Sequence, residues 1–371
     1  MRVGLVIFGS LETLTGGYLY DRRLLDYLRS RGDQTRVVSL PLRTYPRHLA
    51  DNFSPSLARR LAGECFDILL QDELNHPSLV MLNRWLTARA GYPIVALVHL
   101  LRSSERRASL LRHAYVAVER RYLATVDAAV FNCETTREAA EGLLGRCIPG
   151  VVAYPGCDHL GVQISEAEVT ARARVMGPLR ILSVANVIPG KGLHFLVTAL
   201  ARLPPDSWRL TVAGSLTMHQ VYVDRLRNLI GSLGLGANVD LLGPVPNQRI
   251  ADLLTRNHLL ALPSSYEAVG IAYLEAMRYG LPVIATSAGG AHEIVDEGCE
   301  GLFVAPGDVD TLSGHLRALV ADRELLLRMG LAARRRAAQH PTWDQSFAYA
   351  RDLLCSLVAS HQRRSRKETS L

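Results

Sequence analysis

Two glutamates, Glu267 and Glu275, lie eight residues apart around a predicted helix start. An apolar run, a proline and two serines precede them and predict a strand and a polar loop. The first helical amides, those of Gly270, Ile271 and Ala272, would lack helical acceptors and would attract an anion. An ionised carboxylate only accepts hydrogen bonds, which suits the paired hydroxyls of a sugar or a ribose. The stretch therefore predicts a site for a sugar, a phosphate and a ribose, although two solvated surface glutamates would have the same spacing.

Lysine is rare in this chain. Of 42 Lys and Arg residues, only Lys191 and Lys367 are lysines. Lys191 lies between Gly190 and Gly192, where a compact ammonium with close backbone approach suits a phosphate oxygen better than a guanidinium does. We therefore predict that Lys191 contacts the anion, and an incidental lysine is the alternative.

The candidate residues lie beside apolar runs that predict buried strands. These runs alternate with helical patterns, which is typical of an α/β domain with a parallel sheet. The runs of the first half are 3–8, 37–40, 68–70, 94–98, 128–131 and 151–154. A second series begins at Arg180 and includes 210–214 and 239–243. Ligands in open α/β sheets bind at the carboxyl ends of strands, where His99 directly follows one run, although a structural histidine would also fit there.

The sequence around the two glutamates resembles the donor-site signature of a known family. The stretches G-L-P-V-I-A-T-S-A-G-G-A-H-E-I-V and G-L-F-V-A-P-G-D follow them. Both are similar to the family-4 retaining glycosyltransferases, whose GT-B fold has two Rossmann-like, doubly wound parallel-sheet domains facing a central cleft. The resemblance implies that Glu267 contacts sugar hydroxyls, that the amides of 270–272 hold the diphosphate, and that Glu275 binds the nucleotide ribose.

The resemblance implies further contacts outside this stretch. Lys191 would clamp the diphosphate, and Asn186, where the family commonly has arginine, is a candidate donor contact. A glycine-rich loop at Gly16 and Gly17 would face the diphosphate, and His99 would lie near the reacting sugar.

The expected domains follow the two series of strands. Residues 1–165 are expected to form an acceptor-binding domain and 180–342 a donor-binding domain, joined by a linker at 166–179. A helix at 343–360 is expected to cross back to the first domain, and 361–371 to be a disordered basic tail.

The predicted activity is transfer of a hexosyl group from a UDP- or GDP-linked sugar to an acceptor hydroxyl on a glycan or glycolipid. The resemblance implies same-face attack with retention, without a protein nucleophile, a metal or a cofactor.

The Asp308-Val309-Asp310 sequence matches the metal-binding pattern of other glycosyltransferases but follows a Pro-Gly pair, which favours a turn. The alternative function is a catalytically silent nucleotide-sugar-binding or scaffold protein. A dinucleotide oxidoreductase is not expected, because the chain has no G-x-G-x-x-G sequence.

Composition limits the partners. The six cysteines have no C-x-x-C spacing, which argues against zinc and disulfides and favours the cytoplasm. The net charge is +7, and 104–123 reads as a basic amphipathic helix, which predicts either a solvated surface or peripheral contact with an anionic membrane on its inner face. Nucleic acid is not an expected partner, because the Arg clusters lack interleaved aromatic residues.

Overall fold

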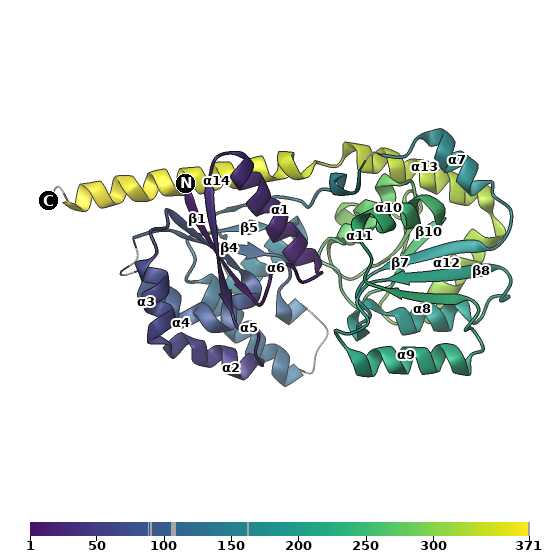
Figure 1. Cartoon of the computed structure of the whole chain (residues 1–371), viewed down its shortest axis with the longest axis horizontal. Coiled ribbons are helices and arrows are strands. Elements are labelled where there is room, and N and C mark those ends of the chain that lie inside the picture. Colours follow the sequence, from purple (N-terminus) through teal and green to yellow (C-terminus); the bar gives the residue numbers. More distant parts are fainter. Residues whose placement is uncertain (88, 90, 105–108, 162, 370–371) are drawn as a thin grey trace. The chain divides into compact units, whose positions relative to one another are not determined.

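The computed structural model describes residues 1–371 except 88, 90, 105–108, 162 and 370–371. The chain divides into two compact units. Unit 1 comprises Met1–Pro155 and Trp343–Leu371, and unit 2 comprises Gly156–Thr342. Each unit contains a six-stranded parallel sheet with helices on both faces (Figure 1). The predicted α/β architecture of two Rossmann-like domains is confirmed.

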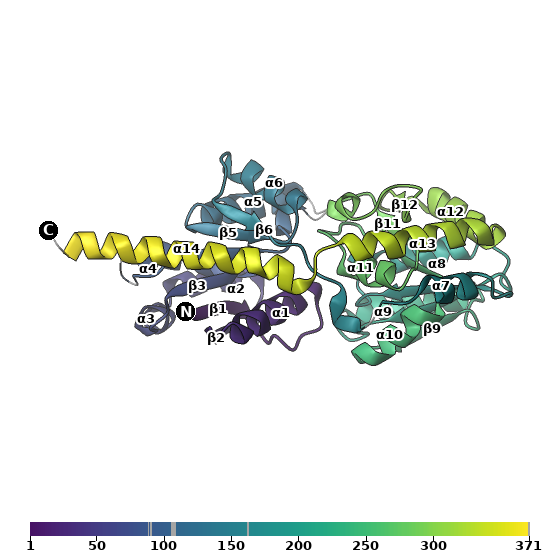
Figure 2. The ribbon, with the colours of Figure 1, turned by 90° about the horizontal axis from the view of Figure 1, so that it is seen from above.

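The sheet of unit 1 has the strand order β2-β1-β3-β4-β5-β6. Its strands are β1 (Arg2–Phe8), β2 (Gln34–Leu40), β3 (Ile68–Asp72), β4 (Ile94–Val98), β5 (Ala128–Phe131) and β6 (Gly150–Val152). Its helices are α1 (Gly16–Ser30), α2 (Tyr45–Ala50), η1 (Asp51–Phe53), α3 (Pro55–Gly63), η2 (Glu73–Asn75), α4 (His76–Thr87), η3 (Arg102–Ser104), α5 (Ser109–Leu123), α6 (Glu134–Leu144) and α14 (Trp343–Thr369). Every residue of β3, β4 and β5 is buried, because helices cover both faces (Figure 2).

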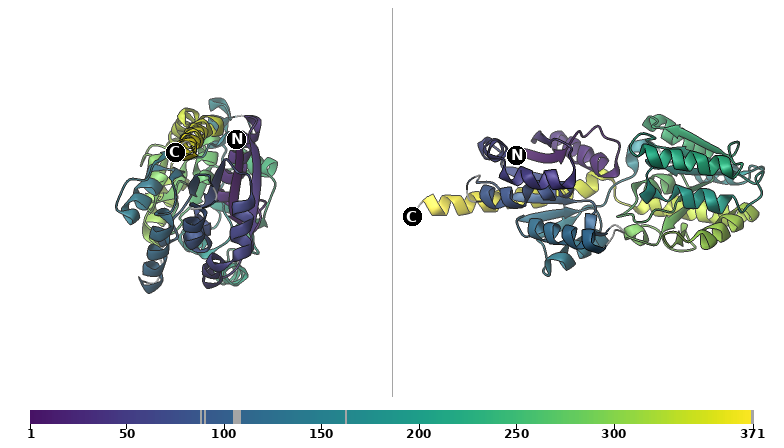
Figure 3. Two further views of the ribbon diagram at one scale, coloured as in Figure 1. Left: turned by 90° about the vertical axis from the view of Figure 1, so that its left-hand side faces the viewer. Right: turned by 90° about the horizontal axis from the view of Figure 1, so that it is seen from below.

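The sheet of unit 2 has the order β12-β11-β10-β7-β8-β9. Its strands are β7 (Leu179–Val184), β8 (Trp208–Ala213), β9 (Val239–Gly243), β10 (Leu259–Leu262), β11 (Val283–Thr286) and β12 (Gly301–Val304). Its helices are η4 (Asp158–Leu160), α7 (Glu166–Ala173), η5 (Pro189–Lys191), α8 (Leu193–Leu200), α9 (Gln220–Ser232), α10 (Asn247–Arg256), α11 (Ile271–Arg278), η6 (Gly290–Glu293), α12 (Val309–Ala321) and α13 (Arg323–Gln339). Helices α8 and α9 cover one face of this sheet and α10 and α11 the other (Figure 1; Figure 3, right).

Two segments differ from their expected structure. Residues 166–179, expected to be a linker, contain α7, which Ser165 and Glu168 begin with a reciprocal capping box. Helix α14 continues to Thr369 through most of the segment expected to be disordered.

The first part of α14 packs on unit 1. The Phe347 ring lies edge-on to the ring of Tyr20 on α1, with 5.0 Å between centroids. Arg351 Nε donates to Asp33 Oδ2 at 2.8 Å, and the N-terminal ammonium donates to Asp33 Oδ1 at 2.8 Å. The helix is therefore held to unit 1 by both apolar and ionic contacts.

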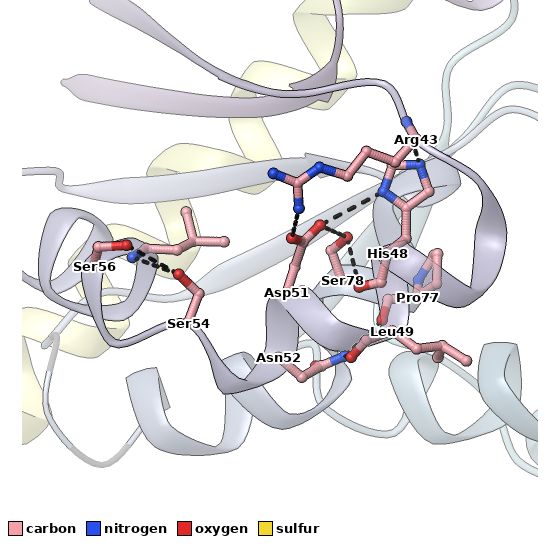
Figure 4. Close-up of polar contacts among 10 residues, drawn as sticks. Arg43, His48, Leu49, Asp51, Asn52, Ser54, Ser56, Pro77 and Ser78 are labelled. Atoms are coloured by element: carbon pink, nitrogen blue, oxygen red, sulfur yellow. Dashed lines mark hydrogen bonds and ion pairs between the residues drawn. The ribbon is translucent and has the colours of Figure 1, made fainter.

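A polar network fixes the segment after β2 (Figure 4). Asp51 is almost fully buried, and its carboxylate accepts from Arg43 Nη1 at 2.7 Å and from Ser78 Oγ at 2.9 Å. The Arg43 amide donates to His48 Nε2 at 3.2 Å. Because Ser78 belongs to α4, these bonds tie the segment to the body of unit 1.

Candidate active site

Three loops at the carboxyl ends of β7, β10 and β11 form the candidate donor site in unit 2. The Ser265 amide donates to Gly190 O at 2.8 Å, which joins the first loop to the second. The Gly290 amide donates to Glu267 O at 3.0 Å, which joins the second to the third. These bonds hold the three loops together without a ligand.

Two glycines permit this close approach of backbones. Gly192 has a φ of +68°, and a Cβ there would lie 2.0 Å from Pro263 O. Gly289 has a φ of +106°, and a Cβ there would lie 1.8 Å from Glu267 O. Any side chain at either position would therefore push two loops apart as well as strain the backbone.

Lys191 and Glu267 meet in this site. Lys191 Nζ donates to Glu267 Oε1 at 2.5 Å, and Ser264 Oγ donates to the same oxygen at 2.6 Å. The side chains of Lys191 and Glu267 are 26% and 12% exposed, so neither charge is sealed from solvent. The structure thus brings together the predicted ammonium and the first predicted carboxylate, which lie 76 residues apart in the chain.

The start of α11 offers free amides as predicted from the sequence. Among the described residues, the amides of Gly270, Ile271 and Ala272 have no hydrogen-bond acceptor. The Tyr273 hydroxyl donates to Leu262 O at 2.7 Å, which fixes the start of the helix against the end of β10. The free amides and the positive end of the helix dipole are therefore held in place for an anion.

Glu275, also on α11, has a partner that sequence reasoning missed. His159 Nε2 lies 3.0 Å from Glu275 Oε1, and the two side chains are 2% and 10% exposed. The only sequence signal for His159 is its position directly after the turn Pro155-Gly156-Cys157-Asp158.

Asn186 has a structural contact in this site. Its Oδ1 accepts from the Ser215 amide at 2.9 Å, which connects the loops after β7 and β8. The side chain is uncharged, so it does not supply the cation that the resembling family commonly has here.

The predicted residues of unit 1 also lie together. A Cβ on Gly17 would lie 3.3 Å from Cδ2 of His99, so the glycine at the start of α1 allows the imidazole to approach. His99 Nε2 bonds Asp21 Oδ1 at 2.8 Å, and Asn132 Nδ2 donates to His99 O at 2.8 Å. Gly16, the first residue of α1, directly follows the cap residue Thr15.

Two family models match the chain. The model described as "Glycosyl transferases group 1" matches residues 166–336, and the model described as "Glycosyl transferase 4-like domain" matches residues 12–156. Both parts of the chain are therefore similar to glycosyl transferases. The two matches lie in different units and include the site residues predicted from the sequence, whereas His159 lies between them.

Curated relatives match this chain over part of their length. An exopolysaccharide phosphotransferase of Streptomyces coelicolor is 34% identical over 55% of this chain and 21% of its own. A GDP-mannose-dependent alpha-(1-6)-phosphatidylinositol monomannoside mannosyltransferase of Mycobacterium tuberculosis is 30% identical over 51% of each chain. The chain therefore spans about half or less of the length of these two relatives.

Solved structures share its fold. A sucrose-phosphate synthase from Thermosynechococcus elongatus superposes with a TM-score of 0.81 at 18% identity, over 97% of this chain and 99% of that chain. Anabaena HepE in complex with UDP-glucose superposes with a TM-score of 0.73 at 20% identity over the whole of both chains. These similarities support the predicted GT-B fold.

Buried acids surround the His99 imidazole in unit 1. Burial opposes the charged imidazolium, but the Asp21 carboxylate outweighs it, so the pKa of His99 is raised. Burial and the negative charge of Asp21 raise the pKa of Asp72 to about 7. The metal-ligating atoms of Asp21, Asp72 and His99 lie within 4.8 Å of one another, a spacing compatible with a metal ion. A second group, Glu73, His76 and Glu119, has the same spacing. Because His99 Nε2 already bonds Asp21, we interpret the first group as a carboxyl–imidazole network.

The Asp308-Val309-Asp310 sequence has a structural role. Asp308 Oδ1 accepts from the Thr311 amide at 3.0 Å and so caps α12, while Asp310 pairs with Arg202. Asp308 thus caps a helix, as the predicted turn implies, whereas the Asp310 side chain is exposed and pairs with an arginine distant in the sequence.

Asp72→Asn is expected to flatten the pH dependence of stability. The usual pKa of an aspartate is 3.8 and that of Asp72 in the fold is about 7. The stability contributed by the protonated carboxyl is therefore fully present below the lower value and lost as the pH rises through the higher one. Between these values, wild type should lose up to about 1.4 kcal/mol per pH unit relative to the variant. Urea unfolding at a series of pH values measures this difference, and parallel curves would contradict it.

Proposed function

We propose that this chain is a retaining hexosyltransferase that uses a UDP- or GDP-linked sugar and an acceptor hydroxyl on a glycan or glycolipid. The observation that carries the proposal is the Lys191–Glu267 pair beside the free amides of α11, on the helix that also bears Glu275. The relatives support a nucleotide-diphosphate sugar as the donor. One is a GDP-mannose-dependent mannosyltransferase, and HepE has been solved with UDP-glucose.

In this proposal the chain acts chiefly by charge stabilisation. Lys191 and the amides of 270–272 stabilise the departing diphosphate, and Glu267 orients the sugar through its hydroxyls. The acceptor hydroxyl attacks from the face that the diphosphate leaves, and a diphosphate oxygen takes its proton. His99 is assigned to the neighbourhood of the reacting sugar. No protein nucleophile, metal or cofactor takes part.

Nucleotide binding tests the donor assignment. A ligand that binds only the folded state raises the melting temperature, so UDP or GDP should do so and ADP should not. If neither UDP nor GDP raises the melting temperature, the proposal is overturned.

A catalytically silent binding protein is the second candidate, because Asn186 supplies no charge. Binding of the nucleotide sugar without its hydrolysis or transfer would favour this candidate.

We also propose that α5 contacts an anionic membrane from the cytoplasmic side. Leu110 and Leu111 are 87% and 55% exposed and precede Arg112, whereas Tyr115 and Tyr122 face the core. The part of 104–123 at 105–108 lies outside the described residues. None of the helices that the structure describes has the length and apolar character needed to span a bilayer.

Leu110→Glu is expected to weaken co-sedimentation with anionic liposomes at low salt, because it adds a negative charge to the proposed contact. Met176→Glu is the matched control, since Met176 is 88% exposed but belongs to unit 2. No sedimentation of the wild type, or equal sedimentation of both variants, would end the membrane proposal.

A further inference from the structure

The contact between His159 and Glu275 joins two segments that lie far apart in the sequence. His159 belongs to η4 and Glu275 to the middle of α11. Nε2 of His159 lies 3.0 Å from Oε1 of Glu275, and the imidazole is 2% exposed. A buried imidazole at this distance restricts the rotamer of the carboxylate.

The backbone around His159 is itself fixed to α11 and the residue that follows it. The Tyr279 hydroxyl donates to Leu160 O at 2.7 Å. The Arg278 guanidinium donates to Gly161 O, with Nε at 3.2 Å and Nη2 at 3.0 Å. The segment that carries the imidazole is therefore anchored at the carboxyl end of α11, the helix that also carries Glu275.

The contact leaves part of the carboxylate available. The His159 contact is made to Oε1, and the Glu275 side chain is 10% exposed, so the carboxylate is not sealed from solvent. Each carboxylate oxygen has two acceptor sites, so Oε1 can also accept a second hydrogen bond. Glu275 can thus still receive two hydroxyl groups while His159 fixes its orientation.

We propose that His159 is a positioning residue for the ribose of the donor nucleotide. It holds the Glu275 carboxylate so that its remaining acceptor sites face the 2′- and 3′-hydroxyls. This inference rests on the proposed function, in which Glu275 binds that ribose. In the opposite role, His159 would occupy Glu275 and compete with the ligand. Removing the imidazole would then tighten ribonucleotide binding instead of weakening it.

Paired nucleotides separate positioning from a general effect on the fold. The affinities of wild type, His159→Ala and His159→Gln for UDP or GDP, whichever binds, are compared with those for the 2′,3′-dideoxy analogue. His159→Ala is expected to weaken ribonucleotide binding about tenfold, the equivalent of one hydrogen bond to a charged group, and to leave the dideoxy affinity unchanged. His159→Gln, which retains an N–H donor, should recover part of the loss.

Arg174→Ala is the control, because Arg174 is an exposed arginine of the same unit and is not one of the residues that anchor the His159 segment. It should leave the preference for ribose intact. If wild type prefers the ribonucleotide and His159→Ala keeps that preference, or binds more tightly, the role of His159 is overturned while the proposed function stands. If wild type binds the ribonucleotide and its dideoxy analogue equally well, Glu275 does not bind the ribose. The positioning role of His159 then fails as well. Absence of nucleotide binding would overturn the proposed function itself.

Discussion

Lys191→Ala is expected to lower the kcat of sugar transfer about a hundredfold, the usual effect of losing one group that stabilises a developing negative charge. The ammonium pairs with Glu267, which precedes the free amides of α11 by three residues. Lys191→Arg should recover only part of the rate, because the broader guanidinium does not match a site shaped for a compact charge. Steady-state kinetics with saturating donor and acceptor measure the effect.

The other lysine of the chain provides the control. Lys367→Ala removes the same charge from the C-terminal segment and should leave kcat unchanged. Melting temperatures of all variants show whether any loss of rate reflects unfolding. Normal turnover by Lys191→Ala would refute the proposed role of the ammonium.

Arg172→Met is expected to lower the free energy of unfolding by about 3 kcal/mol or more, because each hydrogen bond to a charged group contributes about 1.5–3 kcal/mol. The buried guanidinium donates to Leu254 O at 3.2 Å, to Tyr279 O at 2.9 Å and to Gly280 O at 2.6 Å. These carbonyls lie at the carboxyl ends of α10 and α11 and have no further turn of helix to bond. Methionine would leave them buried and unpaired.

Burial, followed by the positive charge of Arg180, lowers the pKa of Arg172 to about 10, so the side chain is still charged at neutral pH. Its positive charge therefore lies at the negative ends of two helix dipoles. Arg174→Met, two residues further along, is the control, since Arg174 is exposed. Urea unfolding of the two variants measures the difference, and equal stabilities would show that the carbonyls find other donors.

The strands and the proximity of Lys191 to Glu267 could be predicted from the sequence for one physical reason. Buried parallel strands are continuous apolar runs, and the loops that follow them meet at one edge of the sheet. The apolar run predicted to precede the two glutamates is thus β10 (Leu259–Leu262), and the polar loop after it contains Glu267. Similarity to a family supplied the individual roles, which remain predictions.

Other features leave little local signal. A lone histidine after a turn does not indicate that its partner is a glutamate more than a hundred residues later, as His159 and Glu275 show. Arg172 is likewise one arginine among many, and only the fold places two helix ends around it. Helix α7 did have a local signal, the Ser165 and Glu168 capping box, but its polar composition favoured a linker.

The shared oxygen of Glu267 has a consequence for ligand selectivity. Because Lys191 and Ser264 both donate to Oε1, a simple anion such as sulfate must compete with an internal counter-ion for the ammonium, and it offers the glutamate nothing in exchange. A glycosyl diphosphate brings an anion for the lysine and hydroxyl donors for the carboxylate in one molecule. If the proposed function holds, we therefore expect the pair to favour this bifunctional ligand over simple inorganic anions.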